Sequence, residues 1–244
     1  MIMKSALRLI ALLALSLLAL QLWFGLRIAL MNVLAPQSTA FQRSEMMRLA
    51  KEKHSIAWSQ DWAADAAISK QLRRAVIASE DAAFVDHGGV EWDAIEKAWD
   101  KNQKAEAKAE TRSKRAAKPV QAKIVGGSTI TQQLAKNLFL SGERNLARKG
   151  QELVITLMLE ALLSKGRILD IYLNNVEWGE GVFGAEAAAH HYFHIDATRL
   201  SPNQAARLAV MLPAPKRFEK RPGSPYVIGR AATIEARMPA VELP

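Results

Sequence analysis

Two neighbouring carboxylates, Glu80 and Asp81, stand at the end of an apolar helical stretch, just before a turn that contains His87. Apolar neighbours strip water from a carboxylate, which raises its pKa toward values useful to a general base. An acidic pair near a helix end is also common as a solvated surface feature. The spacing therefore leaves proton transfer and a structural role both open.

A second group of polar side chains follows two glycines. Thr129 and Gln132 have the spacing of a capping box, which predicts a helix that runs to about Leu138. The start of a helix presents N–H groups and a positive dipole end to an anion, and Lys136 lies one turn beyond Gln132. The alternative is an ordinary capped helix. The polar residues of this group are Ser128, Thr129, Gln132, Gln133, Lys136 and Asn137.

A third group combines cations with one carboxylate at the start of a helix predicted from about Asn145 to Leu163. Its members are Arg144, Arg148, Lys149 and Glu152. Beyond Glu152 the helix is apolar almost all round, which indicates burial. Such a helix suits a charged ligand, although Arg148 and Glu152 are also one turn apart and could form a structural ion pair.

Glu186, His190 and His194 are spaced four residues apart, which could place three metal ligands on one helix face. Alanines and aromatic residues fill this segment, however, and favour packing over metal binding. The chain contains no cysteine, so it has no disulfide, no thiolate metal site and no cysteine nucleophile.

Positive charge is concentrated in one stretch of the chain. The formal net charge is +9, and residues 101–123 contain eight basic and two acidic residues, a net +6. No aromatic residues are interleaved with these cations, so nucleic acid is not the expected partner. The stretch could attract anionic lipid headgroups or form a solvated insertion.

The N-terminus carries a candidate membrane anchor. Leu9 to Leu26 is an uncharged run of 18 residues, long enough to cross a bilayer, and Lys4 and Arg8 favour a cytoplasmic N-terminus. A cleaved signal peptide is the alternative, because the residues near Ala40 are small. Its apolar core would be unusually long, so a retained anchor is expected.

The remaining pattern is helical. Residues 72–99 form a helical stretch interrupted at the histidine-glycine turn, another helical segment covers 168–173, and Ser201 with Pro202 begins a helix that must end at Pro213. Residues 41–75 are polar and predict a helical spacer. No alternating strand pattern persists, so the fold class is mainly α.

In this order the segments resemble the peptidoglycan glycosyltransferase family, which also forms the N-terminal half of bifunctional penicillin-binding proteins. The resemblance covers about residues 70–220 and rests on five ordered segments. These are 80–89, 127–137, 148–174, 179–193 and 205–215. The chain has neither a Ser-x-x-Lys nor a Lys-Thr-Gly signature, so it resembles the monofunctional members.

The resemblance implies a lysozyme-like helical lobe and a smaller membrane-associated jaw, preceded by one transmembrane helix. The expected divisions are a cytoplasmic N-terminus with the anchor (1–36), a connector (37–70), the glycosyltransferase domain (71–222, with the jaw at about 90–125) and a C-terminal tail (223–244). A Lys/Ala-rich insertion at about 104–122 makes the jaw longer than usual.

The resemblance also implies roles for individual residues. Glu80 corresponds to the general base that activates the 4-hydroxyl of the acceptor sugar, and Glu152 to a carboxylate beside the leaving diphosphate. Lys136, Arg144 and Arg148 correspond to phosphate contacts. The other substrate-binding residues implied are Asp81, Phe84, His87, Ser128, Thr129, Gln132, Gln133, Asn137 and Lys149.

The implied substrate is lipid II and the growing glycan strand, on the extracytoplasmic side of the inner membrane. Membrane lipids and cell-division or cell-wall synthesis proteins are further expected partners, and nucleic acid is not. A divalent cation (Mg²⁺ or Mn²⁺) near Glu152 is possible for the family, and no organic cofactor is expected. A lytic transglycosylase or muramidase and a noncatalytic anchored scaffold are the alternative functions.

Overall fold

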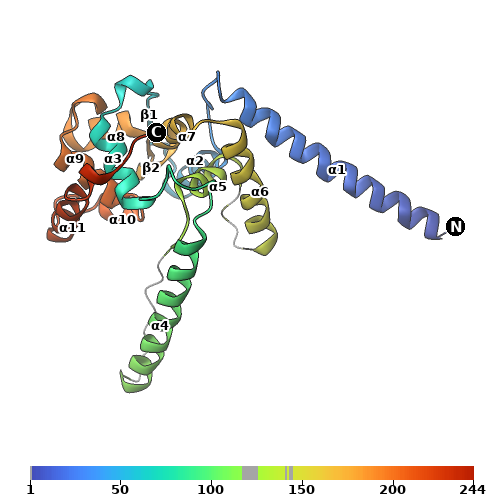
Figure 1. The fold of residues 1–244 in the computed structure, drawn as a ribbon. Coiled ribbons are helices and arrows are strands. Elements are labelled where there is room, and N and C mark those ends of the chain that lie inside the picture. Colours follow the sequence, from blue (N-terminus) through green and yellow to red (C-terminus); the bar gives the residue numbers. More distant parts are fainter. Residues whose placement is uncertain (1, 117–125, 141, 143–144) are drawn as a thin grey trace.

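The protein is described by a computed structural model that covers residues 2–116, 126–140, 142 and 145–244. Helices dominate it, as the sequence predicts (Figure 1). The α-helices are α1 (Ile2–Leu30), α2 (Ala40–Lys53), α3 (Lys70–Glu80), α4 (Trp92–Ala116), α5 (Ile130–Phe139), α6 (Leu146–Leu162), α7 (Lys165–Asn175), α8 (Ala185–Phe193), α9 (Pro202–Met211), α10 (Pro215–Phe218) and α11 (Pro225–Glu235). Short 3-10 turns are η1 (Asp65–Ala67), η2 (Ala197–Arg199) and η3 (Met238–Ala240).

A small sheet, which the sequence pattern does not predict, lies beside α8. β1 (Ser59–Gln60) pairs in parallel with β3 (Val182–Phe183), and β2 (Glu177–Gly179) pairs antiparallel with β3. Strands of two or three residues are too short to show an alternating pattern. Gly181, at the β2–β3 turn, has φ +74°, and its carbonyl oxygen accepts from the N–H of Ser59 at 2.9 Å.

The core is built around α7, which is surrounded by α5, α6 and α8. Its apolar side chains are fully buried, and so are the rings of Trp178 and Phe183 in the sheet. α3 packs against α9, and this pairing positions the end of α3 at the edge of the core. The carboxyl end of α3, the start of α5 and the start of α6 are therefore brought together from three distant parts of the sequence.

The stretch from 37 to 70 is part of the body and not the spacer that its composition suggests. Leu49 of α2 is 2% exposed, and the side-chain amide of Gln42 donates to Asn175 Oδ1 at 3.4 Å. Buried Glu45 accepts from the Lys216 ammonium at 2.5 Å. Sequence analysis missed this packing because the buried residues of α2 are mainly polar and are satisfied by distant partners.

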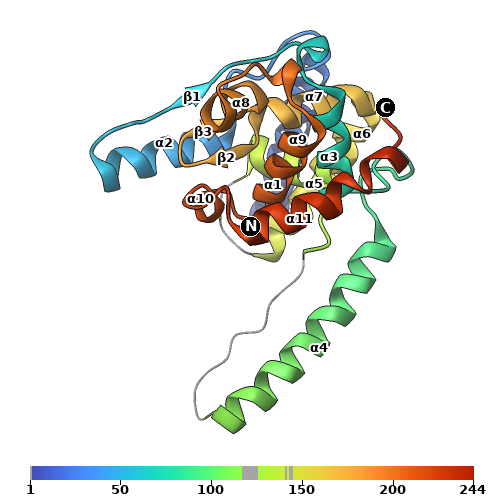
Figure 2. The same ribbon diagram turned by 90° about the vertical axis from the view of Figure 1, so that its left-hand side faces the viewer.

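The expected C-terminal tail is likewise structured. α11 packs along α9 and α3 (Figure 2). It buries Val227, Ala231 and Ile234. Pro225 lies in the first turn of α11, and Ser224 caps that turn by accepting from the N–H of Val227 at 3.4 Å. The helical domain therefore continues past residue 222.

Two helices extend away from the body (Figure 1). Lys4–Leu30 in α1 has a mean hydropathy of 2.3 and is long and apolar enough to cross a membrane. α4 contains the first part of the expected jaw and of the basic stretch, which is therefore helical as far as Ala116. The rest of the expected jaw, from 117 to 125, lies outside the described residues.

We predict that Ile234→Ala destabilises the protein by about 2 to 5 kcal/mol, because it leaves a cavity where a fully buried side chain contacts the core. The matched control is Ile228→Ala on the same helix, where the side chain is 52% exposed and the effect should stay within about 0.5 kcal/mol. Thermal or denaturant unfolding of both variants measures the difference. Equal stabilities would mean that α11 is not packed as described.

Candidate functional site

Glu80 is the last residue of α3, and its carboxylate is largely covered by the body. Its Oε2 accepts a hydrogen bond from Gln133 Nε2 at 3.1 Å, and its Oε1 accepts from the Ser79 hydroxyl at 3.3 Å. The Tyr172 hydroxyl donates to Gln133 Oε1 at 2.9 Å, which fixes the orientation of the Gln133 amide. Gln133 therefore directs an N–H at the carboxylate.

Burial raises the pKa of Glu80, and the neighbouring charge of Asp81 raises it further. The hydrogen bonds from Gln133 and Ser79 oppose this shift, because they stabilise the ionised form. Burial also raises the pKa of Tyr172 well above its ordinary value, so its hydroxyl stays protonated and can only donate to Gln133. The result is a desolvated carboxylate suited to accept a proton.

Asp81 is buried and joins the end of α3 to the start of α5. Its Oδ2 accepts from the backbone N–H of Ile130 at 2.9 Å, and its Oδ1 lies 2.8 Å from His87 Nε2. His87 Nδ1 accepts from the N–H of Gly89 at 3.1 Å, so Nε2 is the nitrogen that bears the proton and donates to Asp81. Both side chains thus secure the turn that follows Glu80.

The predicted capping box at the start of α5 is confirmed. Thr129 Oγ1 accepts from the N–H of Gln132 at 3.1 Å, and Gln132 Oε1 accepts from the N–H of Thr129 at 3.1 Å. The Thr129 hydroxyl also donates to the carbonyl oxygen of Gly89 at 2.6 Å. Gly89 has φ +86°, and a Cβ there would lie 2.7 Å from Glu160 Cγ, so only glycine fits.

Phe84 has no exposed surface, which corrects the expectation that it binds substrate. Its ring packs in the core beneath the Lys165 ammonium, which lies 4.6 Å from the ring centroid. Lys165 also donates to the carbonyl oxygen of His87 at 2.7 Å and to Glu160 at 2.9 Å. Phe84 therefore packs against the core side of the turn that follows Glu80.

A cationic hollow of about 320 Å³ lies between α5 and α6. Its polar lining comes from Ser128, Gln132, Gln133, Lys136, Asn137, Arg148, Lys149 and Glu152, and Phe41 of α2 completes it. These are residues from the second and third groups of the sequence, and the fold brings them together around one hollow. Arg144, also predicted for this site, lies outside the described residues.

Glu152 is 3% exposed and pairs with both cations of its own helix. Arg148 Nη1 lies 2.9 Å from Glu152 Oε2, and the Lys149 ammonium contacts Oε1. The structural ion pair of Arg148 with Glu152, considered from the sequence, is therefore present. Arg148 and Lys149 also line the hollow. Glu152 orients the cations and offsets part of their charge.

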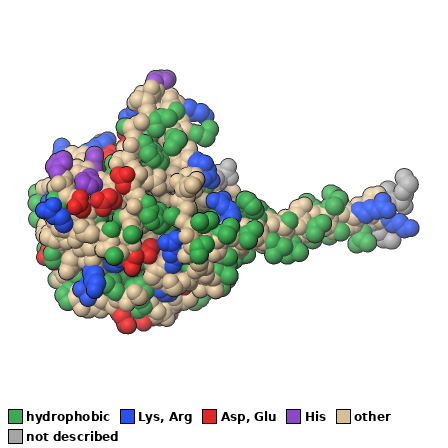
Figure 3. All heavy atoms as spheres, turned by 90° about the horizontal axis from the view of Figure 1, so that it is seen from above, with side chains coloured by type: hydrophobic (Ala, Val, Ile, Leu, Met, Phe, Trp, Pro, Cys, Tyr) green, Lys and Arg blue, Asp and Glu red, His purple; other side chains and the backbone are tan. Residues whose placement is uncertain are grey.

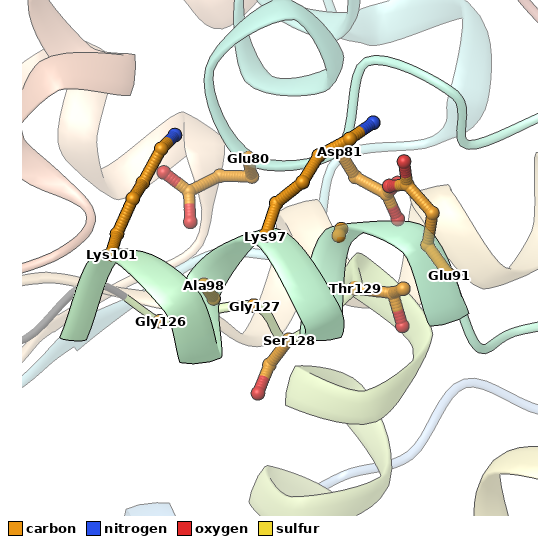
Figure 4. Close-up of a pocket in the computed structure, with 11 residues that line it drawn as sticks. Glu80, Asp81, Glu91, Lys97, Ala98, Lys101, Gly126, Gly127, Ser128 and Thr129 are labelled. Carbon is orange, nitrogen blue, oxygen red and sulfur yellow. The ribbon is translucent and has the colours of Figure 1, made fainter. Parts of the chain in front are cut away.

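A second hollow, of about 210 Å³, contains Glu80 and lies beside α4 (Figure 4). Ser128 lines both hollows and lies between them. A third space of about 220 Å³, lined by Trp99, Ser128 and Lys149 among others, adjoins both. The Glu80 carboxylate and the cationic hollow therefore belong to one groove that passes Ser128.

Lys97 and Lys101 of α4 were not among the predicted site residues. Both extend from α4 toward the side on which Glu80 lies (Figure 4). No ion pair is described for either lysine in the parts of the chain that the structure covers. Their spacing of one helical turn was the available signal, but Lys101 begins a basic stretch that also suits a solvated helix, and Lys97 lies just before that stretch.

Two groups of potential metal ligands, Asp81 with His87 and Glu91, and Glu186 with His190 and Asp196, occur among the described residues. Around Glu152 the described residues supply one carboxylate and two cations, which do not match the oxygen ligands that Mg²⁺ or Mn²⁺ prefers. The set considered on α8, Glu186 with His190 and His194, is not formed: His194 ends the helix at φ 57°, and Asp196 instead lies beside Glu186 and His190. Glu186 Oε2 accepts from the N–H of Ala197, a structural contact.

Comparison with known proteins identifies relatives over most of the chain. Residues 48–239 match the family model described as "Transglycosylase". A protein of Paraburkholderia xenovorans, named "Biosynthetic peptidoglycan transglycosylase", is 50% identical over 234 residues, which cover 96% of this chain and 91% of that protein.

Proteins with the same name occur in Burkholderia thailandensis (52% identity over 228 residues, 93% of this chain and 83% of the relative) and Bordetella pertussis (48% over 224 residues, 92% and 88%). The family match begins within α2 and includes α11, in agreement with the packing of both helices on the body. The chain belongs to the transglycosylase family.

Proposed function

We propose that this protein polymerises the glycan strands of peptidoglycan from lipid II, the undecaprenyl-diphosphate-linked disaccharide-peptide. The main support is that the largely buried Glu80 carboxylate and a cationic hollow lie in one groove, with Ser128 between them. A base is needed at the attacking hydroxyl, and cations are needed at the departing diphosphate. The names of the relatives support this activity.

In the proposed reaction, Glu80 takes the proton from the 4-hydroxyl of the acceptor sugar while that oxygen attacks the anomeric carbon of the donor. The bond from the anomeric carbon to the diphosphate breaks as the new bond forms. Attack from the opposite face converts an α-linked diphosphate into a β-1,4 glycosidic bond, so the configuration is inverted. Undecaprenyl diphosphate leaves with the electron pair of the broken bond.

The cationic hollow would stabilise the negative charge that develops on the diphosphate. Arg148 and Lys149 are oriented before the reaction by Glu152, so little reorganisation is needed at that step. Lys136 lines the same wall from α5. A divalent cation would need diphosphate oxygens as ligands in addition to Glu152, and no step of the proposed reaction is assigned to one.

We also propose that α1 anchors the protein in the cytoplasmic membrane, with the helical domain on the extracytoplasmic side. The support is the length and hydropathy of Lys4–Leu30 and the charges of Lys4 and Arg8 at its start. Lipid II and membrane lipids would then be its immediate partners. Cell-division or cell-wall synthesis proteins are further candidates.

A lytic transglycosylase is the nearest competing function, since it also uses a glutamate in a helical groove. It has no need for a cationic diphosphate pocket, which is the feature that favours synthesis here. Purified protein incubated with lipid II in detergent should yield longer glycan. Shortening of added glycan strands, without growth from lipid II, would establish the lytic alternative.

We predict that Glu80→Gln lowers polymerisation by about 10²- to 10⁴-fold, because the amide cannot accept the acceptor proton. The matched control is Glu96→Gln, at an exposed position on α4. Product length from labelled lipid II, measured with and without a chelator, is the assay. Full activity of the Glu80 variant in a cell that depends on this protein would favour a noncatalytic scaffold instead.

We predict that Gln133→Leu moves the acidic limb of the pH–rate profile to higher pH. The lost N–H no longer stabilises the Glu80 carboxylate, so its already raised pKa rises further and the base is protonated over a wider pH range. Tyr172→Phe should shift the limb in the same direction by less, because Gln133 remains but is less well oriented. An unchanged limb in both variants would show that Glu80 does not titrate in this profile.

A further inference from the structure

The last part of α1 lies on α6. Gln21 and Gln151 exchange two side-chain hydrogen bonds of 2.9 and 3.0 Å. Farther along, Asn32 Nδ2 donates to the carbonyl oxygen of Leu162 at 2.9 Å. Both contacts join residues 130 positions apart, so the two helices run side by side in the same direction. Ile28, near this contact, is fully buried.

The free part of α1 is short compared with a bilayer. All residues from Lys4 to Leu20 are exposed, and the docked part begins at Gln21. These 17 residues span about 26 Å at 1.5 Å per residue, whereas the hydrocarbon core of a bilayer is about 30 Å thick. The charges of Lys4 and Arg8 shorten the apolar part further. If α1 spans a membrane, its docked part and the adjoining part of α6 must enter the outer leaflet.

The exposed side of α6 is suited to that environment. An uncharged stripe follows the helix from its first turn to its last, with members three or four positions apart and therefore on one face. We call it the α6 stripe; it consists of Leu146, Gly150, Val154, Leu157 and Ala161, all exposed. Leu146 is 91% exposed and Leu157 52%. Hydrophobic side chains also cover surface near the base of α1 (Figure 3).

We propose that the α6 stripe contacts the acyl chains of the outer leaflet, so that α6 is a second membrane-contacting element beside α1. Leu146 lies deepest, and Leu162, beside Asn32, lies nearest the headgroups. This inference rests on the proposed membrane anchoring.

Single-cysteine labelling tests the depth of α6 directly, because the chain has no cysteine of its own. The full-length protein is reconstituted in vesicles of phosphatidylethanolamine and phosphatidylglycerol. An environment-sensitive fluorophore is attached in Leu146→Cys, Leu157→Cys and Leu162→Cys. Leu13→Cys in α1 is the reference inside the bilayer, and Ala232→Cys, exposed on α11, is the reference in water.

Spin-labelled lipids should quench the labels at 146 and 157 several-fold more than the label at 232, in the order 146, 157, 162. Aqueous iodide should show the reverse order. The inference is overturned if the labels at positions 146 and 157 are quenched by lipid as weakly as the label at position 232, while the label at position 13 is strongly quenched. It is also overturned if the label at position 13 is quenched by aqueous iodide and not by lipid, since α1 then does not span the bilayer. Polymerisation is assayed separately: lipid-quenched labels without polymer would refute the proposed activity and leave this inference intact.

Discussion

The groove depends on the buried carboxylate of Asp81. It accepts from the first N–H of α5 and from His87, and it directly follows Glu80 at the end of α3. A carboxylate at a helix N-terminus is stabilised by the unpaired N–H groups and by the helix dipole. One side chain therefore joins two helices and the turn between them. The position of Glu80 relative to Gln133 follows from this junction.

Charge in the groove is divided between its two ends. Around Glu80 the environment is desolvating and contains one oriented amide donor, which favours a carboxylate with a raised pKa. Beyond Ser128 the wall is cationic, and buried Glu152 keeps Arg148 and Lys149 in place. A proton acceptor and a binding place for an anion can thus coexist, because Arg148 and Lys149 pair with Glu152. Lys97 and Lys101 line the hollow of Glu80, and no ion pair between them and its carboxylate is described in the covered parts of the chain.

Local signals in the sequence predicted many elements well. The capping boxes at Thr129 and Ser201 mark the starts of α5 and α9. The apolar run after Glu152 correctly predicted a helix, but the burial predicted for it holds on one face only, because Val154 and Leu157 are exposed. Each of these signals involves residues within a few positions of one another. Such patterns survive tertiary packing because the capping bonds form within a single helical turn.

Features that depend on distant residues were missed. Glu80 alone resembles a surface acid, and its burial and amide partner come from α5 and α7, more than 50 residues away. α2 buries Gln42 and Glu45 because Asn175 and Lys216 satisfy them, whereas composition suggested a solvated spacer. The β1–β3 pairing joins Ser59 to Val182, two residues that are far apart in the sequence. No local pattern encodes such partners.

The parallel contact of α1 with α6 has a mechanical consequence. A helix that spans a bilayer changes its tilt when its apolar length and the bilayer thickness differ. Gln21 of α1 bonds to Gln151 in the second turn of α6, and Asn32, just after α1, bonds to Leu162 at the end of α6, so a change in tilt would rotate α6 as well. The Arg148–Glu152 pair lies on the first turns of that helix. The acyl-chain length of the membrane would therefore influence the geometry of the groove through the tilt of α1 and the orientation of α6.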